Sequence, residues 1–492
     1  MVDKTIKGIG TKKNTIDLNS ILQGANLLIF IFSCYSYFLN GKNHFVNLNT
    51  IIWGSVLFAQ VGVFLYIEKL RRDPFVILLC FQMVFFYLFR ILTLSIYPFS
   101  FVFDRFEFSP ANLNEAIAFI IVANFALYLS FYLNKAKPAN AGPLKEVSPR
   151  KPYLLLGVLF FVYVMTYSSA LSGAVELVVG FINNLFINVA VVIFMIIIYL
   201  MLFNHKLSFL NKILLISGLL IYVVIATLSG SRSAVITISY FLLFATLAIS
   251  GAVRIKRVYL VIGVFFVPLM VVFFTVATFL RPRLENRADV NGDTFRVLRE
   301  FDLKQTITDG GEIILSPIFG RIGFLDFCAE VMANQDKYQE VFSFSFYAKS
   351  LVDNVLTPGF DVFDTPKTSN AISFVYYKQG TPKKSKVSDI YQSDEFTIYG
   401  EAYALFGKWF AIIPIFFMGF AFKRLYVKIN DINIFSYYVK RSFVLYVFLT
   451  FLNSFGLDWL LFDIIGIMFT YLIFKSFFKF TKPHSVVLTS DL

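Results

Sequence analysis

Histidine, cysteine and charged residues are all scarce in this chain. Of its 492 residues, 3 are histidine and 3 are cysteine, and 15% are charged, whereas charged residues make up about 25% of an average soluble domain. Cys34, Cys80 and Cys328 form no CxxC pair and no disulfide framework. With so little histidine, proton transfer falls to carboxylates or to the substrate itself. The sequence therefore predicts chemistry without a metal or a cofactor.

Nucleotide-binding loops and internal repeats are also missing. Without a glycine-rich phosphate loop there is no site for a nucleotide, so we expect energy to come from the substrate or from an ion gradient. The N-terminal stretch "MVDKTIKGIGTKKN" is basic and polar, and no apolar segment begins before residue 18. We therefore expect no cleavable signal peptide, so that the first membrane helix itself directs the chain to the membrane.

Long apolar runs dominate the rest of the chain, since 58% of the residues are hydrophobic and 18% are aromatic. A membrane-spanning helix needs about 20 mostly apolar residues, and a window of that length gives about twelve spans. The sequence is therefore predicted to be an all-α polytopic membrane protein. The expected spans are 18–39, 45–67, 74–97, 111–134, 153–171, 181–203, 213–229, 233–252, 258–280, 402–422, 441–457 and 459–477.

The positive charges indicate how these spans are oriented. The net charge is +13, but the basic residues form short runs between spans rather than the basic face of a soluble nucleic-acid-binding module. Nucleic acid is therefore not an expected partner. Every second connection is basic, which places both termini in the cytoplasm. The basic connections are "EKLRRD" (68–73), "KAKP…PRKP" (135–152), "NHKLSFLNK" (204–212), "RIKR" (254–257), "KRLYVK" (423–428) and the tail "KFTKPH".

This orientation divides the chain into three parts: spans one to nine in 1–280, a large outer loop in 281–401, and spans ten to twelve with a cytoplasmic tail in 402–492. A loop of such length is usually functional. Two of its stretches are predicted to be amphipathic helices that lie on the outer membrane surface or cap a cavity. They are "SPIFGRIGFLDFCAEVM", with apolar residues near helical spacing, and "FYAKSLVDNVLTPGF", which Pro358 and Gly359 end.

Arg232 lies in "TLSGSRSAVI" (227–236), which contains a short polar stretch between the seventh and eighth spans on the predicted outer side. Small neighbours allow close approach, and a guanidinium grips phosphate oxygens in a planar, bidentate way. One interpretation is therefore a phosphate clamp at the outer lipid boundary. The equally weighted alternative is an arginine that snorkels to the interface and anchors a helix end.

Arg90 is the strongest charge anomaly, because it lies within the third span, in "FFYLFRILTLSIYPF". A charge at that depth should face a polar cavity or a partner, so Arg90 is a candidate substrate-binding residue. The alternative is a buried pair with an acid such as Glu115 of the fourth span.

Three further arginines, Arg281, Arg283 and Arg287, cluster where the ninth span is predicted to leave the membrane on the outer side. The positive-inside rule disfavours basic residues there. We therefore interpret the cluster as a site for an anionic ligand. Binding to lipid head groups is an equally good alternative.

Glu401 opens the tenth predicted span in "YGEAYALFG" and closes the long loop. The helix dipole alone would favour an acid at this position, but its place opposite the arginines makes it a candidate general base. Other acids predicted to lie outside are Asp326, Glu330, Asp361, Asp364, Asp394 and Glu395, and Asp458 and Asp463 lie near the last outer turn.

Taken together, these features resemble the Wzy-type O-antigen (oligosaccharide repeat-unit) polymerases. The resemblance rests on the outer "SGSR" hairpin, one large outer loop before the last spans, the elements "SLVDNVLTPGF" and "TSNAISFVYY", and the closing "GEAYALFG". It maps the family's motif arginine onto Arg232, and its glycine–acid–aromatic motif onto Gly400, Glu401 and Tyr403. Where many members have asparagine before Phe-Gly, this chain has Leu405.

The resemblance implies a bacterial inner-membrane glycosyltransferase of the C type that joins undecaprenyl-diphosphate-linked oligosaccharides at the periplasmic face, without a metal. Its partners would be that lipid-linked substrate, the bilayer and, in some systems, a chain-length regulator. Two alternatives remain. An O-antigen ligase generally relies on a periplasmic histidine, which this loop lacks. A lipid-linked oligosaccharide flippase would show inverted repeats and broken helices with polar residues near the midplane.

Overall fold

The computed structural model describes the chain in separate stretches. They are residues 15–41, 45–71, 73–96, 108–134, 208–228, 254–256, 292–300, 323–356, 362–376, 397–428 and 434–453, with scattered residues at 157, 272–280, 383 and 461–468. These stretches are helical apart from two short antiparallel strands, β1 (Thr15–Asp17) and β2 (Arg254–Lys256), in which Ile16 pairs with Ile255.

The described residues contain four helical segments that are long and apolar enough to cross a membrane, in agreement with the predicted membrane character. They are α1 (Leu18–Asn40), α2 (Leu48–Arg71), a third segment from Pro74 to Ser95, and α5 (Pro110–Leu133). The third segment is made of α3 (Pro74–Gln82), a π-helical turn η3 (Met83–Leu88) and α4 (Phe89–Ser95). Their bounds agree with the first four predicted spans.

The four segments define two ends of one bundle. Asn40, Leu48, Ser95 and Pro110 share one end, here called the Pro110 end, where Asn40 Nδ2 donates to the Ser95 carbonyl at 3.2 Å. The opposite end of the bundle is here called the Pro74 end. There the Asp73 carboxylate caps α3 by accepting from the Phe75 amide. Proline at the first helical position suits both starts, because its missing N–H would have no partner there.

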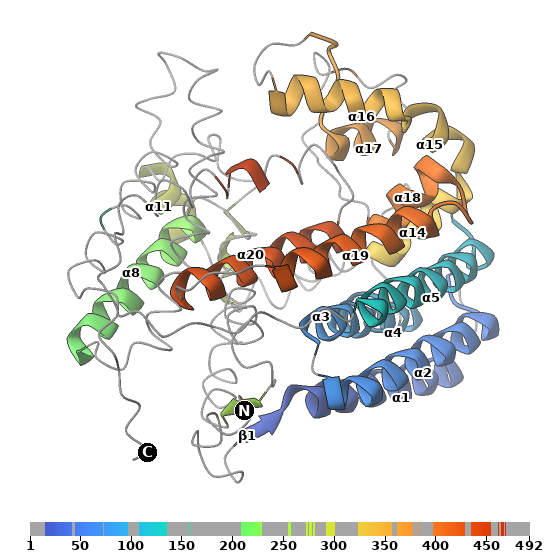
Figure 1. Ribbon diagram of the computed structural model, residues 1–492, viewed down its shortest axis with the longest axis horizontal. Helices are drawn as coiled ribbons and strands as arrows, with labels where there is room; N and C mark the ends of the chain where they lie inside the picture. The colour runs from blue at the N-terminus through green and yellow to red at the C-terminus, as the bar shows by residue number, and fades with distance from the viewer. Residues whose placement is uncertain are drawn as a thin grey trace.

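Two further helices extend the bundle. α19 (Ile412–Lys428) runs parallel to α5 from the Pro110 end to the Pro74 end, where Lys423 pairs with Asp73. α20 (Ile434–Asn453) packs against α19 and α3, and the Leu452 carbonyl accepts from Gln82 of α3. Figure 1 shows α19 and α20 side by side, and α8 (Phe209–Leu228) lies toward the opposite edge of the view from α5. α8 matches the predicted span 213–229, and α20 overlaps 441–457.

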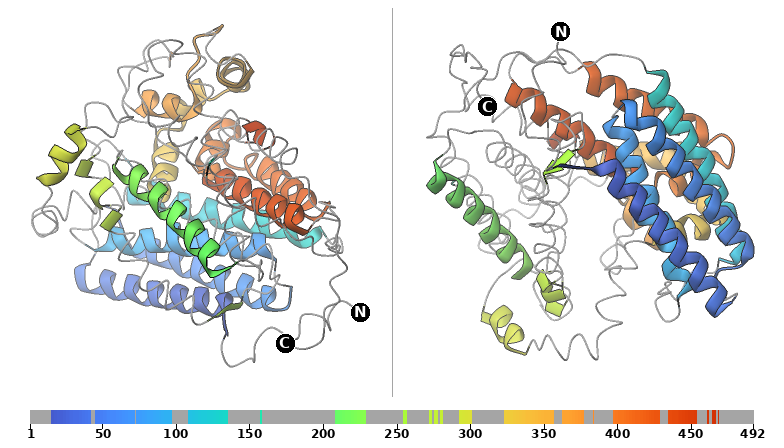
Figure 2. Two further views of the ribbon diagram at one scale, coloured as in Figure 1. Left: turned by 90° about the vertical axis from the view of Figure 1, so that its left-hand side faces the viewer. Right: turned by 90° about the horizontal axis from the view of Figure 1, so that it is seen from below.

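The long-loop segment supplies most of the short helices. Those described are α11 (Gly292–Arg299), α14 (Phe324–Ala333), α15 (Gln335–Val341), α16 (Phe344–Leu351), the π-helical turn η5 (Val352–Leu356), α17 (Thr368–Tyr376) and α18 (Ile398–Phe406). Both predicted loop helices are therefore present, and the first is described from Phe324 onward. α15, α16 and α17 gather beside α14 and α18, away from α1 and α2 (Figures 1 and 2).

Of the two predicted positions, the outer membrane surface is wrong for α14, because this helix is built into the bundle, whereas the capping of a cavity stays a prediction. Its residues from Leu325 to Met332 are buried, and it packs on α5 and α18. The Phe324 ring lies 5.1 Å from that of Phe86, in the middle of the third segment. The acids at 326 and 330 are therefore surrounded by protein rather than by water.

The prediction of one continuous span over 402–422 is also wrong. α18 ends at Phe406, Gly407 adopts φ 74°, and a new helix begins at Ile412. A positive φ at glycine ends a helix without the steric strain that other residues would meet. The hydropathy window does not detect this break because the residues around the turn, Trp409 and Phe410 included, are also apolar.

α18 begins deep in the bundle rather than at its surface. The Tyr399 hydroxyl donates to Asn124 Oδ1, which lies about 21 Å along α5 from Pro110 at 1.5 Å per residue. At the other end, Lys408 pairs with Glu115 near the Pro110 end. α18 therefore rises toward the Pro110 end, and α19 returns from it. The other predicted spans, 153–171, 181–203, 233–252, 258–280 and 459–477, lie wholly or mostly outside the described residues.

Candidate functional site

Three of the predicted site residues are described, and they lie on two helices, α4 and α18, that both pack against or pair with α14. Arg90 is on α4, and Glu401 and Tyr403 are both on α18. The other four, Arg232, Arg281, Arg283 and Arg287, lie outside the described residues. The predicted phosphate clamp and arginine cluster therefore stay predictions.

Arg90 forms a bidentate ion pair with Asp326 of α14. Its Nε lies 3.0 Å and 3.1 Å from the two carboxylate oxygens, and its Nη2 lies 2.5 Å from Oδ2. The remaining terminal nitrogen, Nη1, donates to Thr93 Oγ1 at 3.2 Å. The two side chains are 0% and 1% exposed. Such a fork-on-carboxylate contact is the strongest arrangement that an arginine makes with an acid.

The alternative partner for Arg90, Glu115, is wrong. Glu115 instead accepts from Lys408 at 2.7 Å, in a pair whose side chains are 34% and 41% exposed. Glu115 lies in the second turn of α5, at the Pro110 end, and its side chain is 34% exposed, whereas Arg90 is fully buried. The structure therefore agrees with the alternative, a buried pair with an acid, but the acid is Asp326 of the long loop.

The π-helical turn η3 directly precedes Arg90 and contributes to its placement. Such a turn inserts one extra residue into a helix and so re-aims the residues that follow. Asp326 sits in an environment that opposes charge: burial raises the pKa of its carboxyl, and the Arg90 guanidinium works against that rise. A guanidinium keeps its proton, so Arg90 remains a cation in this buried pair.

Glu401 lies in the first turn of α18 and is 1% exposed. Thr397 caps the helix by accepting from the Gly400 amide at 3.4 Å, and its carbonyl accepts from the Glu401 amide at 3.1 Å. The Tyr347 hydroxyl of α16 is 3.5 Å from Glu401 Oε2. The carboxylate is therefore enclosed between α18 and the loop helix α16, with a phenol as a neighbour.

Tyr403 faces a different set of neighbours. Its hydroxyl donates to Gln335 Oε1 of α15 at 3.2 Å, and its ring meets that of Phe119 of α5 edge-on at 5.4 Å. It is nearly buried, at 3% exposed. The structure thus brings Tyr403 close to Glu401 along α18 but turns it toward α5 and α15.

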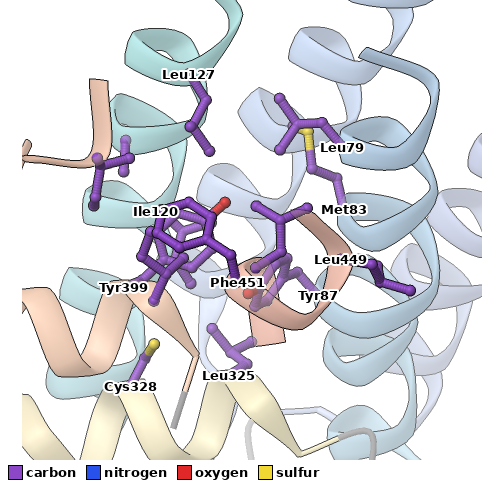
Figure 3. Close-up of a cluster of buried hydrophobic side chains, with 14 of the residues drawn as sticks. Leu79, Met83, Tyr87, Ile120, Leu127, Leu325, Cys328, Tyr399, Leu449 and Phe451 are labelled. Atoms are coloured by element: carbon purple, nitrogen blue, oxygen red, sulfur yellow. The ribbon is translucent and has the colours of Figure 1, made fainter. Parts of the chain in front are cut away.

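Two groups that the sequence did not single out connect α14 to α18. The Cys328 thiol lies 3.1 Å from Thr397 Oγ1, and burial raises the pKa of this thiol to about 12, so it stays protonated. Leu325 and Cys328 share a buried cluster with Tyr87, Ile120 and Tyr399 (Figure 3). The available signal was the stretch "FLDFCAEVM", in which two acids interrupt an otherwise apolar helix.

A second group of missed residues organises the loop beyond the bundle. Asp353 of η5 is buried and accepts from the backbone amides of Phe363 and Thr365, the latter at 2.8 Å. Asn354 donates to the Ser350 and Thr365 carbonyls. Carboxylates that accept backbone amides fix loops, so these residues hold the segment after η5 against α16.

The chemistry that the described residues offer is that of carboxylates, tyrosines and one arginine. Among these residues, no three His, Cys, Asp or Glu side chains lie close enough together to hold a metal ion. A buried carboxylate next to a phenol can accept or relay a proton. Compared with known protein families, with curated proteins and with solved structures, the chain shows no match.

Proposed function

We propose that this protein is a polymerase that joins undecaprenyl-diphosphate-linked oligosaccharide repeat units at the periplasmic face of a bacterial inner membrane. The sequence resemblance to Wzy-type polymerases supports this function. In this proposal the Pro110 end of the bundle faces the periplasm, and both termini are cytoplasmic. A lipid-linked substrate would then meet a site built where the long loop enters the membrane.

The observation that carries the proposal is the placement of Glu401. It lies on the motif helix of the resemblance, is enclosed by the loop helix α16, and is 1% exposed. A polymerase of this kind needs a base for the acceptor hydroxyl in a site that excludes water, because water would otherwise compete as acceptor. A carboxylate held between a membrane hairpin and a loop helix meets both requirements.

The proposed roles follow from charge. Glu401 deprotonates or orients the acceptor hydroxyl. Arg232, together with Arg281, Arg283 and Arg287, stabilises the diphosphate that leaves, since fixed cations at low dielectric suit a developing dianion. Tyr403 is proposed to contribute to sugar binding.

A flippase for the same lipid-linked oligosaccharides is the second candidate, and one observation favours it. α14 and α18 are short helices that begin at mid-depth, and the Arg90–Asp326 pair is buried beside them. Discontinuous helices with buried polar groups near the midplane are typical of transporters. The short helices of the long outer loop, of which α16 packs over Glu401, have no evident use in a flippase. Their presence favours the polymerase.

Deleting the gene separates the two functions. A strain without the polymerase, but with a ligase, should display surface glycolipid that carries single repeat units and no longer chains. A strain without the flippase should display none and should keep lipid-linked single units on the cytoplasmic leaflet. Gel analysis of the surface glycolipid measures the chain length. Spheroplasts prepared without protease are used to determine which leaflet holds the lipid-linked units. Full-length chains in the deletion strain would refute both proposals.

A further inference from the structure

We infer that Arg90 is a positioning residue: it holds Asp326, thereby docks α14 against the third membrane segment, and through α14 fixes α18 with Glu401. This role differs from the diphosphate binding that the sequence alone suggested for Arg90. The docking itself is independent of what the protein does; only its effect on polymer formation rests on the proposed function.

The contacts of the guanidinium leave no side open to a ligand. Nε and Nη2 both engage Asp326, and Nη1 engages Thr93, which itself donates to the Arg90 carbonyl at 3.0 Å. Arg90 is 0% exposed. A diphosphate could reach it only by expelling Asp326, which would strand a carboxylate in a buried, apolar place.

A short series of contacts leads from this pair to Glu401. Asp326 and Cys328 lie within one turn of α14, and the Cys328 thiol contacts Thr397 Oγ1 at 3.1 Å. Thr397 is the residue that caps α18, and its carbonyl accepts from the Glu401 amide. Rings support the same junction, because Tyr399 of α18 packs edge-on against Tyr87 at 5.8 Å. Displacing α14 would therefore displace the start of α18.

Arg90 and Asp326 respond differently to the loss of their partner. Asp326 can take up a proton and become neutral, whereas an arginine cannot lose its charge in a protein. Removing Asp326 should therefore disturb the junction more than removing Arg90. Replacing both by apolar residues of similar size leaves no buried charge, and such replacements of buried ion pairs are often tolerated.

Cys328 provides a native reporter of docking. The full-length protein in membranes would carry Cys34→Ala and Cys80→Ala, so that Cys328 is its one thiol, and would be treated with N-ethylmaleimide, which crosses membranes. In this background Cys328 should react slowly, because it is 0% exposed. We expect Asp326→Leu to raise the labelling rate by about tenfold or more, Arg90→Met to raise it less, and the Arg90→Met/Asp326→Leu double variant to restore slow labelling.

The Glu115–Lys408 pair is a matched control, since it too is an ion pair between helices, here α5 and the α18–α19 hairpin, but its side chains are 34% and 41% exposed. Exposed pairs contribute little, so Glu115→Leu and Lys408→Met should leave Cys328 labelling unchanged. Slow labelling in both Arg90→Met and Asp326→Leu would overturn the docking role. Fast labelling in the double variant would do so as well.

Polymer formation in the deletion strain then separates positioning from substrate binding. A positioning residue predicts that Asp326→Leu abolishes long chains and that the double variant restores them. Slow Cys328 labelling without long chains in the double variant would show that Arg90 is needed for the reaction itself and would overturn the inference. If the unmodified protein makes no polymer in this strain, the proposed function fails, whereas the labelling result still decides the docking.

Discussion

Glu401 and Tyr403 are two positions apart on α18, yet they contact different helices. Successive residues turn by about 100° around a helix, so these two side chains point about 200° apart. Accordingly, Glu401 approaches Tyr347 of α16, whereas Tyr403 donates to Gln335 of α15. In the resemblance, Glu401 and Tyr403 belong to one motif, but in the structure they face different sides of α18.

The first prediction tests the carboxylate of Glu401. Glu401→Gln keeps the shape of the side chain and removes the base, so polymer formation should fall by about 10²–10⁴-fold, the usual contribution of a general base. Glu340→Gln is the matched control, because Glu340 is an exposed acid on the loop helix α15. Chain-length gels of membranes with equal amounts of each variant measure the effect. Normal polymer from Glu401→Gln would leave only the helix-dipole interpretation of this acid.

The second prediction concerns Arg232, which lies outside the described residues. If it clamps a diphosphate, Arg232→Ala should insert normally and lose about 3–4 kcal/mol of transition-state stabilisation, or about 10²–10³-fold in rate. Arg232→Lys keeps the charge without the planar fork, so it should restore activity only in part. A snorkelling anchor would instead be replaced fully by lysine. The length distribution of the surface glycan distinguishes the two.

The third prediction tests the close approach of α19 to α5. A Cβ on Gly419 would lie 2.5 Å from Ser130 Oγ and 2.8 Å from Leu127 Cδ2. Gly419→Ala should therefore push the helices apart or force new rotamers, at about 1–3 kcal/mol of unfolding free energy. Gly24→Ala is the control, because nothing lies within 4 Å of the added atom. Thermal unfolding of the detergent-purified variants should show a lower midpoint for Gly419→Ala only.

The fourth prediction tests orientation. In a cysteine-free background, cysteines on the outer side should react with an impermeant thiol reagent in intact cells, and cytoplasmic ones should react only after the membrane is opened. The predicted outer positions are Ser231, Val290, Glu340 and Ile390, and the predicted cytoplasmic positions are Leu70, Asn140, Ser208 and Lys256. Labelling of Glu340→Cys only in opened cells would reverse the topology and remove the periplasmic site.

The ends of the first four spans follow from local sequence signals. Asp73 with Pro74, and Ser109 with Pro110, mark helix starts by capping chemistry, and each start is followed by an apolar run long enough to cross a bilayer. Such signals need no knowledge of the rest of the chain. This is why the predicted bounds agree closely with the structure.

The site depends on a short buried helix, a helix break and a long-range contact, and a hydropathy window that moves along the sequence detects none of these. α14 has 10 residues, too few to score as a span, although it is buried as deeply as one. A short turn that begins at Gly407 separates α18 from α19. The partner of Arg90 is 236 positions away, so the sequence indicated that an acid was needed but not which one.

That separation also constrains how the protein is made. Ribosomes add about 5–20 residues per second, so the third segment waits roughly 10–50 s in the membrane before the chain that carries Asp326 is synthesised. An unpaired arginine costs about 2.5–3.5 kcal/mol at the centre of a membrane helix and less toward its end, where Arg90 lies. The apolar residues of the third segment, and its neighbours α1, α2 and α5, offset this cost until Asp326 arrives. Capture of α14 and α18 is consequently a late step of biogenesis, completed only after translation has passed the long loop.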